Sequence, residues 1–152
     1  IRPIAISMMI AIGIGLHNFG EGLAIGAAVL LGEVALSSFL ILGFTLHNTT
    51  EGLAIVAPMA TSRRIPFTKL IIMGLIAGGP TIIGAWIGGF LYSPIATVIF
   101  LSIGAGAIFQ VIYSIGSWMY HTNGGRGLLN NHWIIIGFAF GMLIMYLTGL
   151  LT

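Results

Sequence analysis

Five long apolar stretches, separated by short polar segments, constrain the fold of this chain more than any other feature. They cover about residues 3–31, 34–60, 67–91, 94–120 and 132–152. A helix of about 20 apolar residues spans the hydrocarbon core of a bilayer, and each stretch is at least that long. Because 58% of the residues are hydrophobic and only 5% are charged, the composition is typical of an integral membrane protein. We predict an all-α fold: a polytopic transmembrane helix bundle with five spans, forming one domain over residues 1–152.

Glycine spacing supports helices rather than a membrane barrel. The chain has 23 glycines and little strand-type alternation of polar and apolar residues. Pairs of glycines four residues apart let two transmembrane helices approach closely. Such pairs occur at Gly22 and Gly26, Gly74 and Gly78, Gly84 and Gly88, and Gly137 and Gly141. We interpret these pairs as packing positions without a chemical role.

The basic residues predict how the bundle is oriented. If the chain alternates through five spans, one side carries the turns Gly32–Glu33 and Tyr92–Ser93. All five basic residues then fall on the other side: Arg2, Arg63, Arg64, Lys69 and Arg126. Basic residues in short loops stay in the cytoplasm, so this side should be cytoplasmic and the C-terminus should lie outside. We expect the protein in the plasma (inner) membrane. Five scattered basic residues do not make a nucleic-acid surface, and we expect no nucleic-acid partner.

A polar motif occurs twice within the first two apolar stretches. Residues 16–25 read Leu-His-Asn-Phe-Gly-Glu-Gly-Leu-Ala-Ile, and residues 46–55 read Leu-His-Asn-Thr-Thr-Glu-Gly-Leu-Ala-Ile. In each copy the His and the Glu are four residues apart, so they share one face of a helix, with the Asn beside them. The candidate metal ligands are His17, Asn18, Glu21, His47, Asn48 and Glu51.

The depth of the motifs in the membrane is the main argument for a metal. Each motif lies near the middle of its stretch, and a two-residue turn joins the two stretches, so the motifs should lie level with each other. A carboxylate at the centre of a spanning helix costs roughly 2.5 to 3.5 kcal/mol on insertion scales. Two neighbouring carboxylates, Glu21 and Glu51, would also repel each other unless they are protonated or bridged by a cation. The alternative is that the motif side chains only hydrogen-bond to one another and hold the helices together.

The ligand types favour particular metals. Mixed nitrogen and oxygen ligands favour Zn²⁺, with Fe²⁺, Mn²⁺, Co²⁺ and Cd²⁺ as alternatives, and disfavour Cu⁺, which prefers sulfur. The chain has no cysteine, which excludes thiolate ligands. An intramembrane metalloprotease would need a His-Glu-x-x-His helix, and no such segment occurs. We therefore predict neither catalytic residues nor an organic cofactor, and a protein that is not an enzyme. A non-transporting metal sensor or structural metal protein stays open as an alternative to a transporter.

The paired motifs, His17-Asn18-Phe19-Gly20-Glu21-Gly22 and His47-Asn48-Thr49-Thr50-Glu51-Gly52, resemble those of the Zrt/Irt-like (ZIP) family of divalent metal transporters. The resemblance implies that the chain corresponds to helices four to eight of an eight-helix fold, so three helices would precede it. It also implies a two-metal centre with these His, Asn and Glu side chains as ligands, Zn²⁺ as the transported substrate moving into the cytoplasm, and a homodimer.

One position in the third apolar stretch differs from the family pattern. Prolines also interrupt the regular helices expected for the second and third stretches. Many family members carry a Glu-Pro pair where this chain has Gly79-Pro80. The sequence therefore leaves open whether the site holds one metal ion or two. Pro80 and the glycines before it mark a weak point in the helix. Pro58 in the second stretch predicts a kink there.

Overall fold

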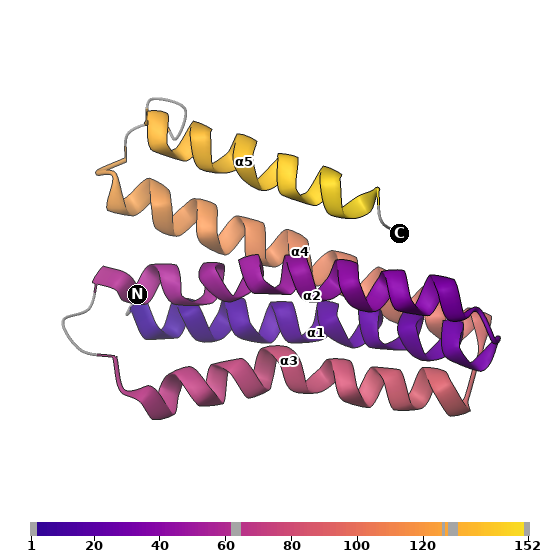
Figure 1. The fold of residues 1–152 in the computed structure, drawn as a ribbon. Helices are drawn as coiled ribbons and strands as arrows, with labels where there is room; N and C mark the ends of the chain where they lie inside the picture. The colour runs from indigo at the N-terminus through magenta and orange to yellow at the C-terminus, as the bar shows by residue number, and fades with distance from the viewer. Residues whose placement is uncertain (1–2, 62–64, 126, 128–130, 151–152) are drawn as a thin grey trace.

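The computed structural model describes residues 3–61, 65–125, 127 and 131–150, and this part of the chain is helical throughout its apolar stretches (Figure 1). The elements are α1 (Pro3–Leu30), α2 (Val34–Val56), η1 (Ala57–Thr61, a 3-10 helix), α3 (Phe67–Phe90), α4 (Pro94–Thr122) and α5 (His132–Gly149). Five helical spans are long and apolar enough to cross a membrane. The prediction of an all-α bundle with five spans is confirmed.

Successive helices run antiparallel (Figure 1). The starts of α1, α3 and α5 and the ends of η1 and α4 lie at one end of the bundle. At the other end, Gly32 makes the first turn with φ of 74°. The second turn ends at Ser93, whose Oγ accepts a hydrogen bond from the Ala96 amide and so caps α4, with Pro94 as its first residue. Of the basic residues that predict orientation, Lys69 lies in the first turn of α3. Arg2, Arg63, Arg64 and Arg126 lie outside the described residues.

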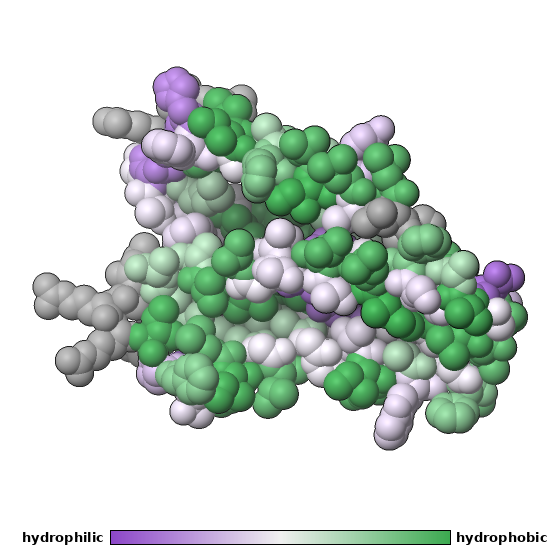
Figure 2. All heavy atoms as spheres, viewed as in Figure 1, coloured by the Kyte–Doolittle hydropathy of each residue, from purple (hydrophilic) through white to green (hydrophobic). Residues whose placement is uncertain are grey.

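Helix α1 is the centre of the bundle. It contacts α2, α3 and α4, and it is the most buried of the five helices. Helix α5 is the least buried and contacts α2. It lies at the edge of the bundle (Figure 1). The space-filling view shows hydrophobic residues over most of the visible face, with hydrophilic residues at the two ends and a small hydrophilic area near the middle (Figure 2). This pattern suits a bundle whose outer face contacts lipid.

Glycines bring α1 and α3 into backbone contact. A Cβ atom built on Gly22 or Gly26 would collide with a carbonyl oxygen of α3, and one built on Gly84 or Gly88 would collide with a carbonyl oxygen of α1. Two of the four predicted glycine pairs therefore pack against each other. The other two pairs have open space around them: Gly74 and Gly78, and Gly137 and Gly141. Hydrogen atoms on a glycine Cα can point at a carbonyl oxygen, which adds weak attraction to this close packing.

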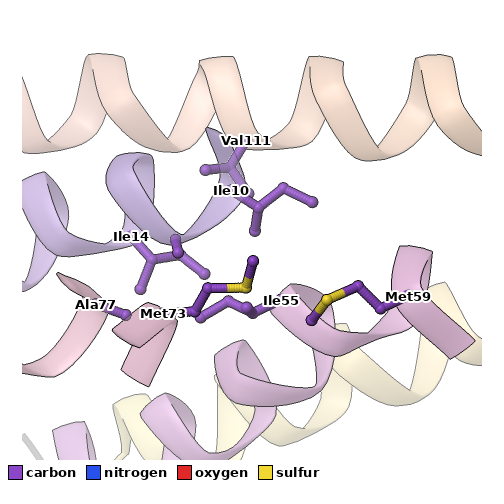
Figure 3. Packing of buried hydrophobic residues seen from close by; sticks show 8 residues of the cluster. Ile10, Ile14, Ile55, Met59, Met73, Ala77 and Val111 are labelled. Carbon is purple, nitrogen blue, oxygen red and sulfur yellow. The ribbon is translucent and has the colours of Figure 1, made fainter. Parts of the chain in front are cut away.

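An apolar cluster, which we call the apolar plug, fills one part of the bundle. Its buried residues come from α1, α2, η1, α3 and α4 (Figure 3): Ile10, Ala11, Ile14, Ile55, Met59, Met73, Ala77 and Val111. On α1 these residues precede the first motif, and on α2 and η1 they follow the second. Because the helices are antiparallel, the apolar plug lies between the motifs and the end of the bundle where α1 begins.

The two prolines interrupt their helices differently. The sequence predicts a kink at Pro58 inside the second span, but α2 ends as an α-helix at Val56 and continues as the 3-10 helix η1, with Pro58 fully buried. Proline has no amide hydrogen for the carbonyl four residues earlier, so the regular α-helical hydrogen bonds end here and the chain continues with 3-10 geometry. Pro80 lies inside α3, which bends near its middle (Figure 1).

Candidate metal site

The two polar motifs face each other across the contact between α1 and α2. Ligand atoms of His17, Glu21 and His47 all lie within 4.8 Å of one another, and this is the one such group of His, Cys, Asp or Glu in the part of the chain that the structure describes. The i and i+4 spacing of His17 and Glu21 places both on the same face of α1. The short turn between α1 and α2 then brings His47 level with them.

Glu21 is the centre of the group. Its Oε1 lies 2.6 Å from His47 Nε2 and 3.4 Å from His17 Nε2. Its Oε2 accepts a hydrogen bond of 3.2 Å from the Asn48 Nδ2 amide. The Glu21 residue is only 4% exposed, and His47 is 8% exposed. One buried carboxylate thus contacts three polar side chains from two helices, whereas the sequence alone treats the two motifs as equivalent.

Three further oxygen atoms of the motifs are buried without a partner. Among the described residues, four buried side-chain polar atoms lack a hydrogen bond, and three of these belong to the motifs: Asn18 Oδ1, Asn48 Oδ1 and Glu51 Oε2. Buried acceptors without a donor are rare in folded proteins because their desolvation is not offset. An amide oxygen or an ionised carboxylate oxygen can accept a hydrogen bond or bind a cation, but it cannot donate. Mutual hydrogen bonding of the motif side chains explains the contacts of Glu21, but it leaves these three oxygens without a partner.

A cavity of about 420 Å³ adjoins the group. His17, Glu21, His47 and Glu51 line it together with mostly apolar side chains of α1, α2, α4 and α5: Ala24, Phe44, Leu101, Gly104, Ala105, Ile108 and Met145. The Phe44 ring packs edge-on against the His47 imidazole, with ring centroids 5.4 Å apart, and so restricts its orientation. Polar ligands on one wall and apolar side chains on the others are typical of a site that binds a small ligand.

Small residues bring α4 against the first motif. A Cβ built on Gly104 would lie 3.3 Å from the His17 Cα, and one built on Gly20 would lie 3.3 Å from the Leu101 side chain. No role was predicted from the sequence for these α4 positions or for Met145 of α5. The run Gly104-Ala105-Gly106-Ala107 could have predicted the close contact of α4 with another helix, since four small residues in a row allow such an approach.

No fixed cation in the described residues balances the two carboxylates. Lys69 is the one Lys or Arg in the described part of the chain, and it is exposed in the first turn of α3. Glu21 and Glu51 lie close enough for their charges to repel each other. The site therefore combines two carboxyl groups, two imidazoles and two amide oxygens, in a position where a divalent cation would neutralise both carboxylates.

Three of the six predicted ligands form a close group in the structure, and the other three lie near it. His17, Glu21 and His47 form the close group, and Asn48 reaches that group through its hydrogen bond to Glu21. Glu51 lines the same cavity. Asn18 is buried, with its amide nitrogen bonded to the Ala77 carbonyl of α3 and its oxygen without a partner.

Comparisons of the chain with protein-family models, with curated proteins and with solved structures find no match.

Proposed function

We propose that this protein transports divalent transition metal ions, most favourably Zn²⁺, across a membrane through the site between α1 and α2, as its resemblance to the ZIP family implies. The observation that carries the proposal is the set of three buried motif oxygens without hydrogen-bond partners beside the group of His17, Glu21 and His47. A bound dication would give these oxygens a partner and would balance the charges of two buried carboxylates.

The ligand set supports Zn²⁺ and ions of similar chemistry as substrates. Imidazole nitrogens and carboxylate oxygens bind Zn²⁺ at about 2.0 to 2.2 Å, and Fe²⁺, Mn²⁺, Co²⁺ and Cd²⁺ accept the same ligand types. Glu21 lies between two kinds of ligand. Its Oε1 faces the imidazoles, and its Oε2 faces the Asn48 amide. A carboxylate in this position can bind one metal ion or bridge two.

The apolar plug defines what release of the ion requires. It lies between the site and the end of the bundle where α1 begins, which the basic residues predict to be cytoplasmic. An ion leaving in that direction needs α1 to move relative to α2, α3 or α4, so that Ile10, Ile14 and their neighbours separate. In this scheme the structure represents a state closed on the cytoplasmic side, and alternating access opens the apolar plug after the ion binds.

Orientation and assembly complete the proposal. The basic loops face the cytoplasm, the C-terminus lies outside, and the protein works in the plasma (inner) membrane as a homodimer. Zn²⁺ then enters from outside and leaves into the cytoplasm.

Zinc flux into proteoliposomes tests the proposal. Replacing His47 by Ala removes a buried imidazole whose Nε2 lies 2.6 Å from Glu21 Oε1, and we expect Zn²⁺ uptake to fall at least about tenfold. The matched control is His132→Ala, which removes an imidazole at the start of α5, away from the cavity. Its uptake should equal that of the unmodified protein. Equal uptake by both variants would refute the assigned site.

The same assay separates transport from the alternative function. A non-transporting sensor or structural metal protein would bind Zn²⁺ through the same residues, and calorimetry would show His47→Ala weakening that binding. The unmodified protein would then show no flux in proteoliposomes.

A further inference from the structure

The hydrogen bond between Asn18 and Ala77 joins the candidate metal site to the helix that Pro80 interrupts. Asn18 lies one residue after His17 on α1 and is 3% exposed. Its Nδ2 donates to the Ala77 carbonyl of α3 at 3.1 Å. A carbonyl oxygen can only accept a hydrogen bond, so the amide nitrogen of Asn18 has to face α3 and its oxygen has to face away from Ala77.

Pro80 leaves one backbone carbonyl of α3 without its usual donor at this turn. Proline has no amide hydrogen, so the Ile76 carbonyl lacks the usual donor four residues later, and the ring also pushes the turn apart. In transmembrane helices, neighbouring helices and side chains supply partners to backbone groups that proline releases. Here α1 lies against two carbonyls of the turn: that of Ile76, which Pro80 leaves without its usual donor, and that of Ala77, whose usual donor, the Thr81 amide, is present. Gly15 lies directly against the Ile76 carbonyl oxygen, and Asn18, one turn further along the same face, bonds to the next carbonyl, that of Ala77.

The Asn18 side chain also lies beside the candidate metal site. Asn18 Oδ1 is buried without a hydrogen-bond partner, and the Asn18 side chain lies beside the Glu51 carboxylate. One short side chain therefore bonds to α3 with its nitrogen next to Glu51, while its buried oxygen has no partner. Asn48, the equivalent residue of the second motif, differs because its nitrogen bonds to Glu21.

We propose that Asn18 is a positioning residue that links occupancy of the metal site to the bend of α3 at Pro80. A cation bound to Asn18 Oδ1 fixes the amide plane, and the fixed amide holds the Ala77 carbonyl and the bend. When the ion leaves, the amide regains rotational freedom and the turn loosens. The role of the oxygen rests on the proposed function, whereas the role of the nitrogen does not.

The surroundings give the bend room to change. A cavity of about 230 Å³ lies against the interrupted turn, with Gly15, Ile76 and Pro80 among its lining residues. Gly78 and Gly79, which precede Pro80, face open space, since a Cβ atom built on either would have no neighbouring atom within 4 Å. Two glycines and a proline with free space beside them form a turn that can alter its backbone angles without steric conflict.

Hydrogen–deuterium exchange of the full-length protein in nanodiscs tests the link, with Asn18→Ala, Pro80→Ala and the double variant measured first without zinc. We expect Asn18→Ala to speed exchange of amides over residues 77–84 roughly three- to tenfold, the effect of losing one interhelical hydrogen bond. Pro80→Ala restores the missing amide, so adding Asn18→Ala to it should change exchange by less than about twofold. Asn48→Ala is the matched control and should leave exchange of this segment unchanged.

Exchange measured with zinc then tests the role of Asn18 Oδ1. Zinc should slow exchange over residues 77–84 in the unmodified protein and should lose this effect in Asn18→Ala. Asn18→Ala could change exchange over residues 77–84 equally in the unmodified protein and in the Pro80→Ala variant. That result would overturn the role of the nitrogen. Zinc that binds by calorimetry but leaves α3 exchange unchanged would overturn the link to occupancy. Absence of zinc binding by calorimetry would refute the proposed function and the link, while the metal-free comparison would still decide the role of the nitrogen.

Discussion

We expect Glu21→Gln to abolish the proposed zinc transport and to lower zinc affinity at least about 100-fold. Glu21 contacts His17, His47 and Asn48, so it holds the largest share of the site's polar contacts. Glutamine has nearly the same shape but carries no charge, and it therefore removes one of the two carboxylates that would balance a dication. Even groups outside the ligand shell cost about 10- to 100-fold when they are removed from metal sites, and a charged ligand should cost more.

The chain supplies its own control for this substitution. Its three acidic residues are Glu21, Glu51 and Glu33, and Glu33 lies in the exposed turn between α1 and α2. Glu33→Gln makes the same chemical change away from the site, and we expect it to keep normal zinc affinity by calorimetry and normal flux in proteoliposomes. If Glu21→Gln kept both properties as well, Glu21 would not bind the ion.

We expect Gly88→Val to destabilise the folded bundle by about 3 kcal/mol, the upper part of the range for overpacked positions. A Cβ atom at Gly88 would collide with the Leu23 carbonyl oxygen and would crowd the Leu23 Cα at 3.0 Å and the Ala27 amide nitrogen at 3.1 Å. These are backbone atoms, so no flexible side chain can yield, and α1 and α3 have to separate. Because α1 is the central helix, the loss of this contact should weaken the whole bundle.

Gly74→Val is the matched control because it places the same side chain on the same helix. No atom lies within 4 Å of a Cβ at Gly74. Thermal unfolding in detergent, followed by size-exclusion chromatography, should show a clearly lower midpoint for Gly88→Val and a nearly unchanged midpoint for Gly74→Val. Equal midpoints would contradict the close contact between α1 and α3.

Much of the fold could be predicted from the sequence because apolar length and turn residues decide it locally. The first apolar stretch was predicted over residues 3–31, and α1 covers Pro3–Leu30. Gly32 and Ser93-Pro94 carry the turn and cap chemistry that ends one helix and begins the next. Which glycines pack could not be predicted, since the pairs at Gly84 and Gly74 have the same spacing but only the first lies against α1.

The proximity of His17, Glu21 and His47 could be predicted from the sequence, but the asymmetry of their contacts could not. The i and i+4 spacing places His17 and Glu21 on one face, and the repeat suggests the same for the second motif. The sequence cannot show that Glu21 contacts both imidazoles, because that depends on the rotation of α2 about its axis. It also cannot show that Asn18 turns its nitrogen to Ala77, because that depends on how α3 packs against α1.

Zinc K-edge X-ray absorption of the purified, zinc-loaded protein tests most directly whether the two motifs bind a dication. We expect nitrogen and oxygen neighbours at about 2.0 to 2.2 Å with the scattering pattern of two imidazoles, and loss of that pattern in the His17→Ala, His47→Ala double variant. A spectrum of hydrated zinc without imidazole, or one that the double variant leaves unchanged, would contradict binding at the two motifs.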